Sequence, residues 1–132
     1  MLGGMSSHSV TIGILDDEPQ MRTALTRLLR SHGLEVVTFT RGEDLLAAVF
    51  SRSPWLDCLM LDLHMPGLTG FDVLAALDAA KSTLPVIVFT GHDEPRTASR
   101  VTKLGAINYL LKPLDESALL AAIGQATDGV AH

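Results

Sequence analysis

The sequence predicts one α/β domain in which a parallel β-sheet is covered by helices on both faces. Short apolar runs alternate five times with longer segments whose apolar residues recur at helical spacing. Several runs are continuously apolar rather than alternating, which is typical of parallel strands buried on both faces. The length of 132 residues suits a single domain, and a hydrophobic content of 47% is sufficient for a core.

The first strand is predicted over Val10–Leu15 (VTIGIL), an apolar run that stops at Asp16. Pro19 then opens a helix, because proline is favoured in the first helical turn, and Gly33 is the expected stop. The second strand follows over Leu34–Phe39 (LEVVTF), where interspersed polar residues indicate partial exposure.

The second helix is predicted to begin with a capping box, because Thr40 and Glu43 lie three residues apart before an apolar run. The third strand, Cys58–Leu61 (CLML), is continuously apolar and ends at Asp62. A third helix is expected over Phe71–Ala80, where apolar residues recur at turn spacings.

The fourth strand is predicted over Pro85–Phe89 (PVIVF) and ends at Thr90. A polar helix over Glu94–Leu104 follows and is closed by Gly105. The fifth strand, Asn108–Leu111 (NYLL), is a short run that leads into a lysine. Only the last helix then remains to complete the alternation of strands and helices.

The last helix is predicted to be capped by Asp115, with a buried face made by Leu119, Leu120 and Ile123. Five such strand–helix units with right-handed crossovers predict a doubly wound, flavodoxin-like (βα)5 fold with strand order 2-1-3-4-5. We expect the domain to span residues 10–126, after a flexible lead-in at 1–9 and before a tail at 127–132.

Composition excludes several classes of function. A net charge of −5 argues against direct nucleic acid binding by this segment. No apolar run approaches the ~18 residues of a membrane span, and the N-terminus has no signal-peptide pattern. The single cysteine, Cys58, rules out an intrachain disulfide, is expected to be a buried core residue, and fits a cytoplasmic setting.

Polar residues collect where the strands end. In a parallel α/β sheet these ends meet at one edge, where ligands bind. Three carboxylates at one edge repel each other unless a cation is present, and few oxygen ligands with room for water favour Mg²⁺ or Mn²⁺. With a hydroxyl and an ammonium group, the set suits phosphoryl transfer through an aspartyl phosphate. The residues are Asp16, Asp17, Asp62, Thr90 and Lys112.

Four motifs in order resemble the receiver domain of bacterial two-component response regulators, the CheY-like family. They are ILDDE at 14–18, LMLDLHMPGLTG at 59–70, PVIVFTG at 85–91 and GAINYLLKP at 105–113. The resemblance covers residues 10–126. It implies that Asp62 is the phosphoacceptor, that Asp17 binds Mg²⁺ directly and Asp16 largely through water, and that the backbone carbonyl of His64 is a third metal ligand.

The resemblance also assigns the remaining site residues. Thr90 would bond the phosphoryl group, and Lys112 would pair with it, with the Lys112–Pro113 peptide bond usually cis in the family. Tyr109 occupies the position of the family's switch aromatic and would turn inward as Thr90 moves toward the phosphoryl group. The simpler alternative for Tyr109 is a half-buried aromatic residue of the sheet.

Two histidines are less typical of the family. His64 lies two residues after the acceptor and His92 two after Thr90, at variable positions where the family tunes the lifetime of the phosphoryl group. Two imidazoles there would attract Zn²⁺ or Cu²⁺, or make the lifetime pH-sensitive. The simpler interpretation is two solvated loop histidines.

The resemblance implies a signalling domain that catalyses only its own phosphorylation and dephosphorylation. A sensor histidine kinase or a phosphotransfer protein would donate the phosphoryl group, and an output domain or downstream protein would read the switch. The FTGH stretch at 89–92 and the absence of paired acidic residues before Tyr109 resemble the FixJ type more than the OmpR type. A phosphorylation-linked homodimer is expected through the last two helices and the fifth strand, or through the first and last helices.

Two other functions remain open at this point. A Mg²⁺-dependent phosphohydrolase would also form an aspartyl phosphate, but such enzymes usually carry a second aspartate two residues after the nucleophile, where this chain has His64. A phosphorylation-independent binding module would lack the acceptor, the lysine or the acidic pair, and none of these is missing.

Overall fold

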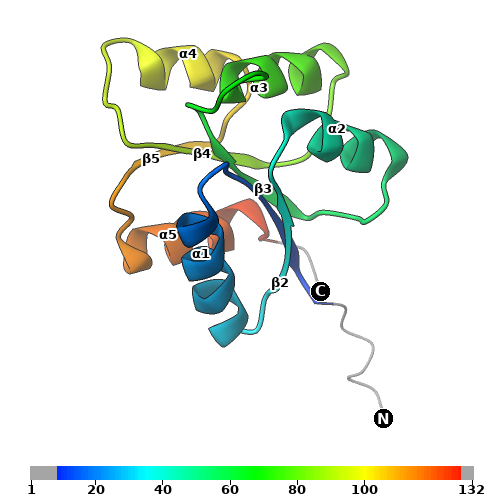
Figure 1. Ribbon diagram of the computed structural model, residues 1–132, viewed down its shortest axis with the longest axis vertical. Helices are drawn as coiled ribbons and strands as arrows, with labels where there is room; N and C mark the ends of the chain where they lie inside the picture. The colour runs from blue at the N-terminus through cyan, green and yellow to red at the C-terminus, as the bar shows by residue number, and fades with distance from the viewer. Residues whose placement is uncertain (1–8, 129–132) are drawn as a thin grey trace.

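The computed structural model describes residues 9–128, which form five strands and five helices in strict alternation (Figure 1). In chain order the elements are β1 Thr11–Leu15, α1 Pro19–Ser31, β2 Glu35–Phe39, α2 Gly42–Ser51, β3 Cys58–Asp62, α3 Gly70–Ala79, β4 Val86–Thr90, α4 Thr97–Lys103, β5 Asn108–Leu111 and α5 Glu116–Ala126. The predicted lead-in and the end of the predicted tail lie largely outside the described residues.

The five strands form one parallel sheet in the order β2-β1-β3-β4-β5. The predicted (βα)5 doubly wound fold and its strand order are therefore confirmed. Helices α1 and α5 cover one face, while α2, α3 and α4 cover the other (Figure 1). Between residues 9 and 128, none of the helices combines the length and apolar character that a membrane crossing requires.

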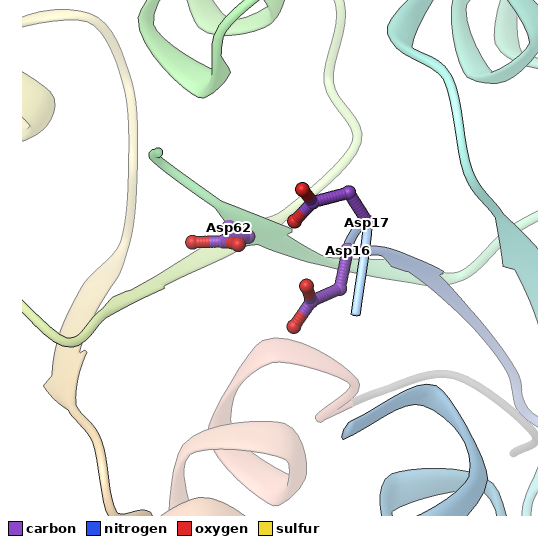
Figure 2. Close-up of side chains that lie close together, drawn as sticks. All are labelled: Asp16, Asp17 and Asp62. Atoms are coloured by element: carbon purple, nitrogen blue, oxygen red, sulfur yellow. The ribbon is translucent and has the colours of Figure 1, made fainter. Parts of the chain in front are cut away.

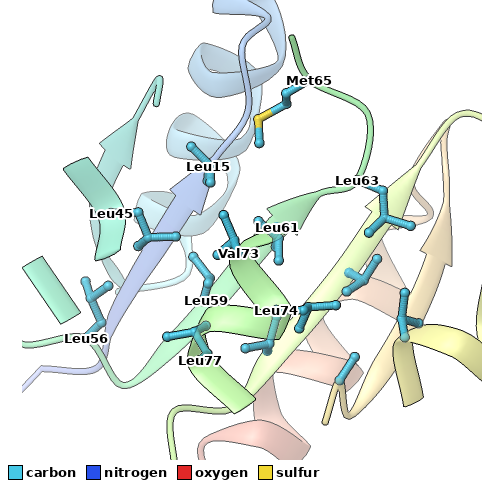
Figure 3. Close-up of a cluster of buried hydrophobic side chains, with 14 residues drawn as sticks. Leu15, Leu45, Leu56, Leu59, Leu61, Leu63, Met65, Val73, Leu74 and Leu77 are labelled. Atoms are coloured by element: carbon cyan, nitrogen blue, oxygen red, sulfur yellow. The ribbon is translucent and has the colours of Figure 1, made fainter. Parts of the chain in front are cut away.

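The central strand β3 separates two hydrophobic cores. Leu59 and Leu61 point into the core beneath α2, α3 and α4 (Figure 3), whereas Cys58 and Met60 point into the core beneath α1 and α5. This alternation follows from the period-two geometry of a strand that is covered on both sides. Cys58 is fully buried and is a core residue, as predicted, and this burial raises the pKa of its thiol to about 12.

Helix α2 lacks the cap that was predicted from the sequence. The predicted capping box at Thr40 and Glu43 is wrong: Arg41 is the N-cap of α2 and makes no side-chain capping bond. Arg41 has an extended backbone, with φ −132° and ψ 139°, so the helix begins at Gly42, where a Cβ would lie 2.8 Å from Leu68. The structure has its capping box at α3 instead, between Thr69 and Asp72.

Helix α4 is shorter than its predicted range of Glu94–Leu104. Pro95 disfavours helical geometry at the preceding residue, and Arg96 has a φ of 67°, which a right-handed helix does not accommodate. The helix therefore begins at Thr97, and it ends before Gly105, which has a φ of 101°, as the sequence predicted. The shortening leaves residues 91–96 as an exposed loop beside the carboxyl end of β4.

Candidate functional site

Three aspartates lie together at the carboxyl edge of the sheet (Figure 2). Strands β1 and β3 are neighbours with Leu15 paired to Leu61, so the residues that end or follow them are placed side by side. One carboxylate oxygen from each of Asp16, Asp17 and Asp62 lies within 4.8 Å of the other two. Among residues 9–128 this is the only group of three or more histidine, cysteine or acidic side chains with that spacing.

The carboxylate of Asp16 is fully buried and only partly satisfied. Its Oδ1 accepts a hydrogen bond from the backbone N–H of Glu18 at 2.9 Å, and Arg22 donates to its carbonyl oxygen at 2.9 Å. Its Oδ2 has no hydrogen-bond partner among the described residues. A buried carboxylate oxygen without a donor is costly, and a cation beside it would remove the cost.

Burial, followed by the charge of Asp16, raises the pKa of Asp62 to about 7. The ammonium of Lys112 and the backbone N–H of His64, which donates to Oδ1 at 3.3 Å, oppose this rise without cancelling it. The centre is therefore short of positive charge. The donor set, the spacing and the unsatisfied oxygen together fit a divalent cation that prefers oxygen ligands.

Lys112 is the cation that the fold itself supplies. Its Nζ lies 3.5 Å from Asp16 Oδ2 and 3.7 Å from Asp62 Oδ2. Burial by itself lowers the pKa of Lys112, but the hydrogen bond to Glu18 and the nearby carboxylates outweigh it, so the pKa is raised and the ammonium stays charged. The bond to Glu18 Oε1, at 3.0 Å, is the shortest of these contacts.

Sequence reasoning assigned no role to Glu18, although it stands in the ILDDE motif beside the two aspartates. Its position directly after the acidic pair was the available signal. The Lys112–Pro113 peptide bond is cis, as the resemblance implied.

Thr90 and Tyr109 lie on the neighbouring strands β4 and β5, where Tyr109 pairs with Val88 and Thr90 with Leu111. Thr90 is fully buried at the end of β4, and its hydroxyl accepts a hydrogen bond from the backbone N–H of His92 at 3.1 Å. Tyr109 in β5 is half-buried, and its hydroxyl donates to Asp93 Oδ1 at 3.5 Å, so its ring reaches toward the loop after β4.

His64 and His92 are brought together although 27 residues separate them. Their ring centroids lie 4.9 Å apart in an edge-to-face arrangement, at the rim of the aspartate site. Pro66 and Gly67, where Gly67 has a φ of 75°, turn the chain away after His64. The structure thus places the expected site residues at or beside the carboxyl edge of the sheet, except Tyr109, which lies within β5 opposite Val88.

The model of the family described as response regulator receiver domain matches residues 12–124. This chain belongs to that family. Its fold and its cluster of aspartates are those of a phosphorylatable receiver domain of two-component signalling, and neither alternative function is favoured. Receiver domains are signalling domains, and they bind Mg²⁺ through an acidic pocket of this kind.

Similar proteins support the assignment. The receiver domain is 35% identical to Nodulation protein W of Bradyrhizobium diazoefficiens, over 93% of this chain and 53% of that protein. It is 37% identical to the transcriptional regulatory protein FixJ of Azorhizobium caulinodans, over 88% of this chain and 54% of that protein. The crystal structure of FixJ-N superposes with a TM-score of 0.82 at 29% identity, covering 95% of this chain and 98% of that one. The chain spans about half the length of these two curated relatives.

Proposed function

We propose that Asp62 accepts a phosphoryl group from a sensor histidine kinase or a phosphotransfer protein. The observation that carries this is the position of Asp62 at the end of β3, within 4.8 Å of two further carboxylates and 3.7 Å from Lys112. A carboxylate oxygen of Asp62 attacks phosphorus, and the P–N bond to the donor imidazole breaks with its electron pair left on nitrogen. Hydrolysis reverses the modification, because water attacks phosphorus and releases inorganic phosphate and the free carboxylate.

The carboxylates of Asp16, Asp17 and Asp62 and the backbone carbonyl of His64 are the residues that would hold Mg²⁺, or Mn²⁺. When bound, such an ion neutralises carboxylate charge and offers open positions to phosphoryl oxygens. Asp17 is exposed and reaches the site from the solvent side, whereas Asp16 is buried. The family resemblance assigns direct coordination to Asp17 and coordination largely through water to Asp16.

Lys112 and Thr90 act on the phosphoryl group after it arrives. The ammonium of Lys112 pairs with a phosphoryl oxygen, and it exchanges part of its contact with Glu18 for the new charge. The hydroxyl of Thr90 donates to a second oxygen, for which it turns away from the backbone N–H of His92. Both movements stay within the carboxyl edge of the sheet.

Tyr109 transmits the change to the surface formed by α4, β5 and α5. Its bond to Asp93 holds the ring toward the β4–α4 loop in this structure, and the space left by Thr90 lets it turn inward. An output domain or downstream protein then reads the altered surface, and the same surface supports a phosphorylation-linked homodimer. By analogy with FixJ, the output is transcriptional, and the domain acts in the cytoplasm.

Acetyl phosphate labelling tests the phosphoacceptor. Incubation with acetyl phosphate and Mg²⁺ is expected to add the mass of one phosphoryl group, and EDTA or Asp62→Asn is expected to abolish the gain. Asp57→Asn is the matched control, because Asp57 is also buried but binds Thr11 and Trp55 at the opposite end of β3. Labelling that persists in Asp62→Asn would show that another residue is the acceptor, and multiple turnover of an added phosphomonoester would favour a phosphohydrolase.

The two histidines are proposed to set the lifetime of the phosphoryl group, since both flank the path of attacking water. His64→Asn and His92→Glu are expected to change the dephosphorylation rate while leaving the extent of labelling intact. If both variants lose phosphate at the wild-type rate, the histidines have no part in the lifetime.

A further inference from the structure

A second set of side chains with metal-ligating atoms stands beside the aspartate site and is not part of the aspartate cluster. His64 comes from the loop after β3, while His92 and Glu94 come from the loop after β4. The His64 Nε2 atom lies 3.5 Å from Glu94 Oε1, and the two imidazole rings are 4.9 Å apart. The three side chains therefore form one cluster that joins two loops.

Two distances within this cluster are close to those between ligands of one metal ion. Two imidazoles that bind a tetrahedral ion at ~2.1 Å have ring centres roughly 5 Å apart, and a nitrogen and an oxygen ligand of such an ion lie about 3.4 Å apart. The observed 4.9 Å and 3.5 Å are close to both values. Two histidines and a glutamate are also a donor set that proteins use for zinc.

The cluster is preorganised but not closed. Within residues 9–128 only the three aspartates have all their ligand atoms within 4.8 Å of one another. Rotation of an exposed side chain would complete the second set, because His92 and Glu94 stand on the exposed loop 91–96. His64 is better held, since the edge of its ring faces Phe71 with centroids 6.4 Å apart.

We propose that His64, His92 and Glu94 bind a divalent transition-metal ion, Zn²⁺ or Cu²⁺, at the rim of the phosphorylation site. Imidazole ligands suit these ions and not Mg²⁺, which demands oxygen, so the two neighbouring sites sort metals by ligand type. The ion clamps the β3–α3 loop to the β4–α4 loop.

The clamp has a consequence for signalling, which rests on the proposed role of Asp62. The backbone N–H groups of His64 and His92 donate to Asp62 Oδ1 and Thr90 Oγ1, respectively. An ion held by both imidazoles fixes these two peptide units and keeps the Thr90 hydroxyl turned away from the phosphoryl group. We therefore expect Zn²⁺ to slow the phosphorylation of Asp62 severalfold.

Calorimetric titration with ZnCl₂, in excess Mg²⁺ to occupy the aspartates, tests binding without any activity measurement. One ion is expected to bind in the micromolar range, and Co²⁺ is expected to give the intense visible absorption of a tetrahedral site. His64→Ala and His92→Ala each remove a ligand and should weaken binding by more than the roughly 10–100-fold that loss of an outer-shell partner costs. His32→Ala is the matched control, because His32 is exposed and also pairs with a glutamate, 3.6 Å from Glu116, and it should bind as the wild type does.

Asp17→Asn separates this site from the aspartate cluster, because it should weaken Mg²⁺ binding and leave Zn²⁺ binding unchanged. Wild-type affinity in His92→Ala would overturn the proposal, as would loss of Zn²⁺ binding in Asp17→Asn or no binding below millimolar Zn²⁺. Circular dichroism verifies folding, and His92→Gln replaces any variant that fails to fold. Labelling of Asp62 with acetyl phosphate and Mg²⁺, without Zn²⁺, is a separate test. Failure of the zinc site would therefore leave the proposed receiver function intact.

Discussion

Replacing the phosphoacceptor with its neutral isostere, Asp62→Asn, is expected to stabilise the metal-free protein. Asp62 is 3% exposed and lies beside the buried Asp16, so its ionised form is unfavourable. Its pKa rises from 3.8 to about 7 on folding. An acid whose pKa is raised on folding binds more protons in the native state, so the wild type loses stability as pH rises between these values.

The size of the effect follows from the same shift. A rise of about three pH units corresponds to roughly 4 kcal/mol at and above neutral pH. This value is already net of the attraction of Lys112, 3.7 Å away, and of the hydrogen bond from the backbone N–H of His64. The asparagine variant recovers only part of it, because the buried site must accommodate an amide NH₂ group in place of a carboxylate oxygen. We therefore expect the variant to gain about 2 kcal/mol or more, or roughly 5 °C in Tm.

Urea denaturation in EDTA measures the difference. The gain should be close to zero at about pH 4, grow with pH and level off above about pH 7. Mg²⁺ should stabilise the wild type and not the variant, which shrinks the gap. Asp57→Asn is the control of opposite sign, because Asp57 accepts hydrogen bonds from Thr11 and Trp55 at 2.9 and 3.0 Å, and its loss should destabilise the fold. An Asp62→Asn variant no more stable than the wild type at pH 8, or a gain that does not change with pH, would refute the electrostatic reasoning.

Three further substitutions test how the site is supported. Gly70→Ala should destabilise the protein by about 1–3 kcal/mol and slow phosphorylation, because the new Cβ would meet the carbonyl oxygen of Asp62 and lie 2.7 Å from Leu63 Cα. In the control Gly124→Ala, in α5, the new Cβ meets nothing within 4 Å, so this variant should gain about 0.5–1 kcal/mol of stability. Equal effects of the two substitutions in urea denaturation would contradict this reasoning. Lys112→Met should tighten Mg²⁺ binding, measured by calorimetry, because it removes a cation that competes for Asp16 and Asp62. The same variant should slow acetyl phosphate labelling, because it also removes the partner of the phosphoryl group. Unchanged Mg²⁺ affinity would argue against the competition. Thr69→Ala should lower the free energy of unfolding by about 1 kcal/mol, because it removes the capping box of α3. Thr102→Ala, on the exposed face of α4, is the neutral reference. Equal stability of the two variants would show that the cap does not stabilise the protein.

The sheet and the positions of the acidic residues were predictable because they depend on patterns local to each strand. A buried parallel strand must be apolar on both faces, so its last residue is the first place where a carboxylate can reach water or a ligand. Once the strand order followed from crossover handedness, Asp16, Asp17 and Asp62 had to meet at one edge. The sequence therefore indicated both the fold and the acidic centre without any contact being known.

The features that the sequence did not predict depend on contacts between distant segments. Helix α2 begins at Gly42, where Leu68 and Val73 leave little room for a Cβ, and a capping pattern in the local sequence cannot reveal this packing. The pairing of Lys112 with Glu18 joins residues 94 positions apart, and only the assembled sheet edge brings them within 3.0 Å. Side-chain partners at the rim of the site therefore had to come from the structure.

His64 combines a backbone position that the local sequence predicts with side-chain contacts that only the structure reveals. Its backbone is held by the fold, because β3 ends at Asp62 and the N-terminus of α3 packs so closely that Gly70 has no room for a Cβ beside residues 62 and 63. Its imidazole is exposed at the rim, where a change of side chain leaves the strand and the helix undisturbed. The peptide unit of residue 64 can therefore support the acidic centre, while its imidazole is free to act together with that of His92 on the neighbouring loop. Chemistry particular to this receiver is thus expected in loop side chains such as His64 and His92, and not in the strand ends that carry phosphorylation.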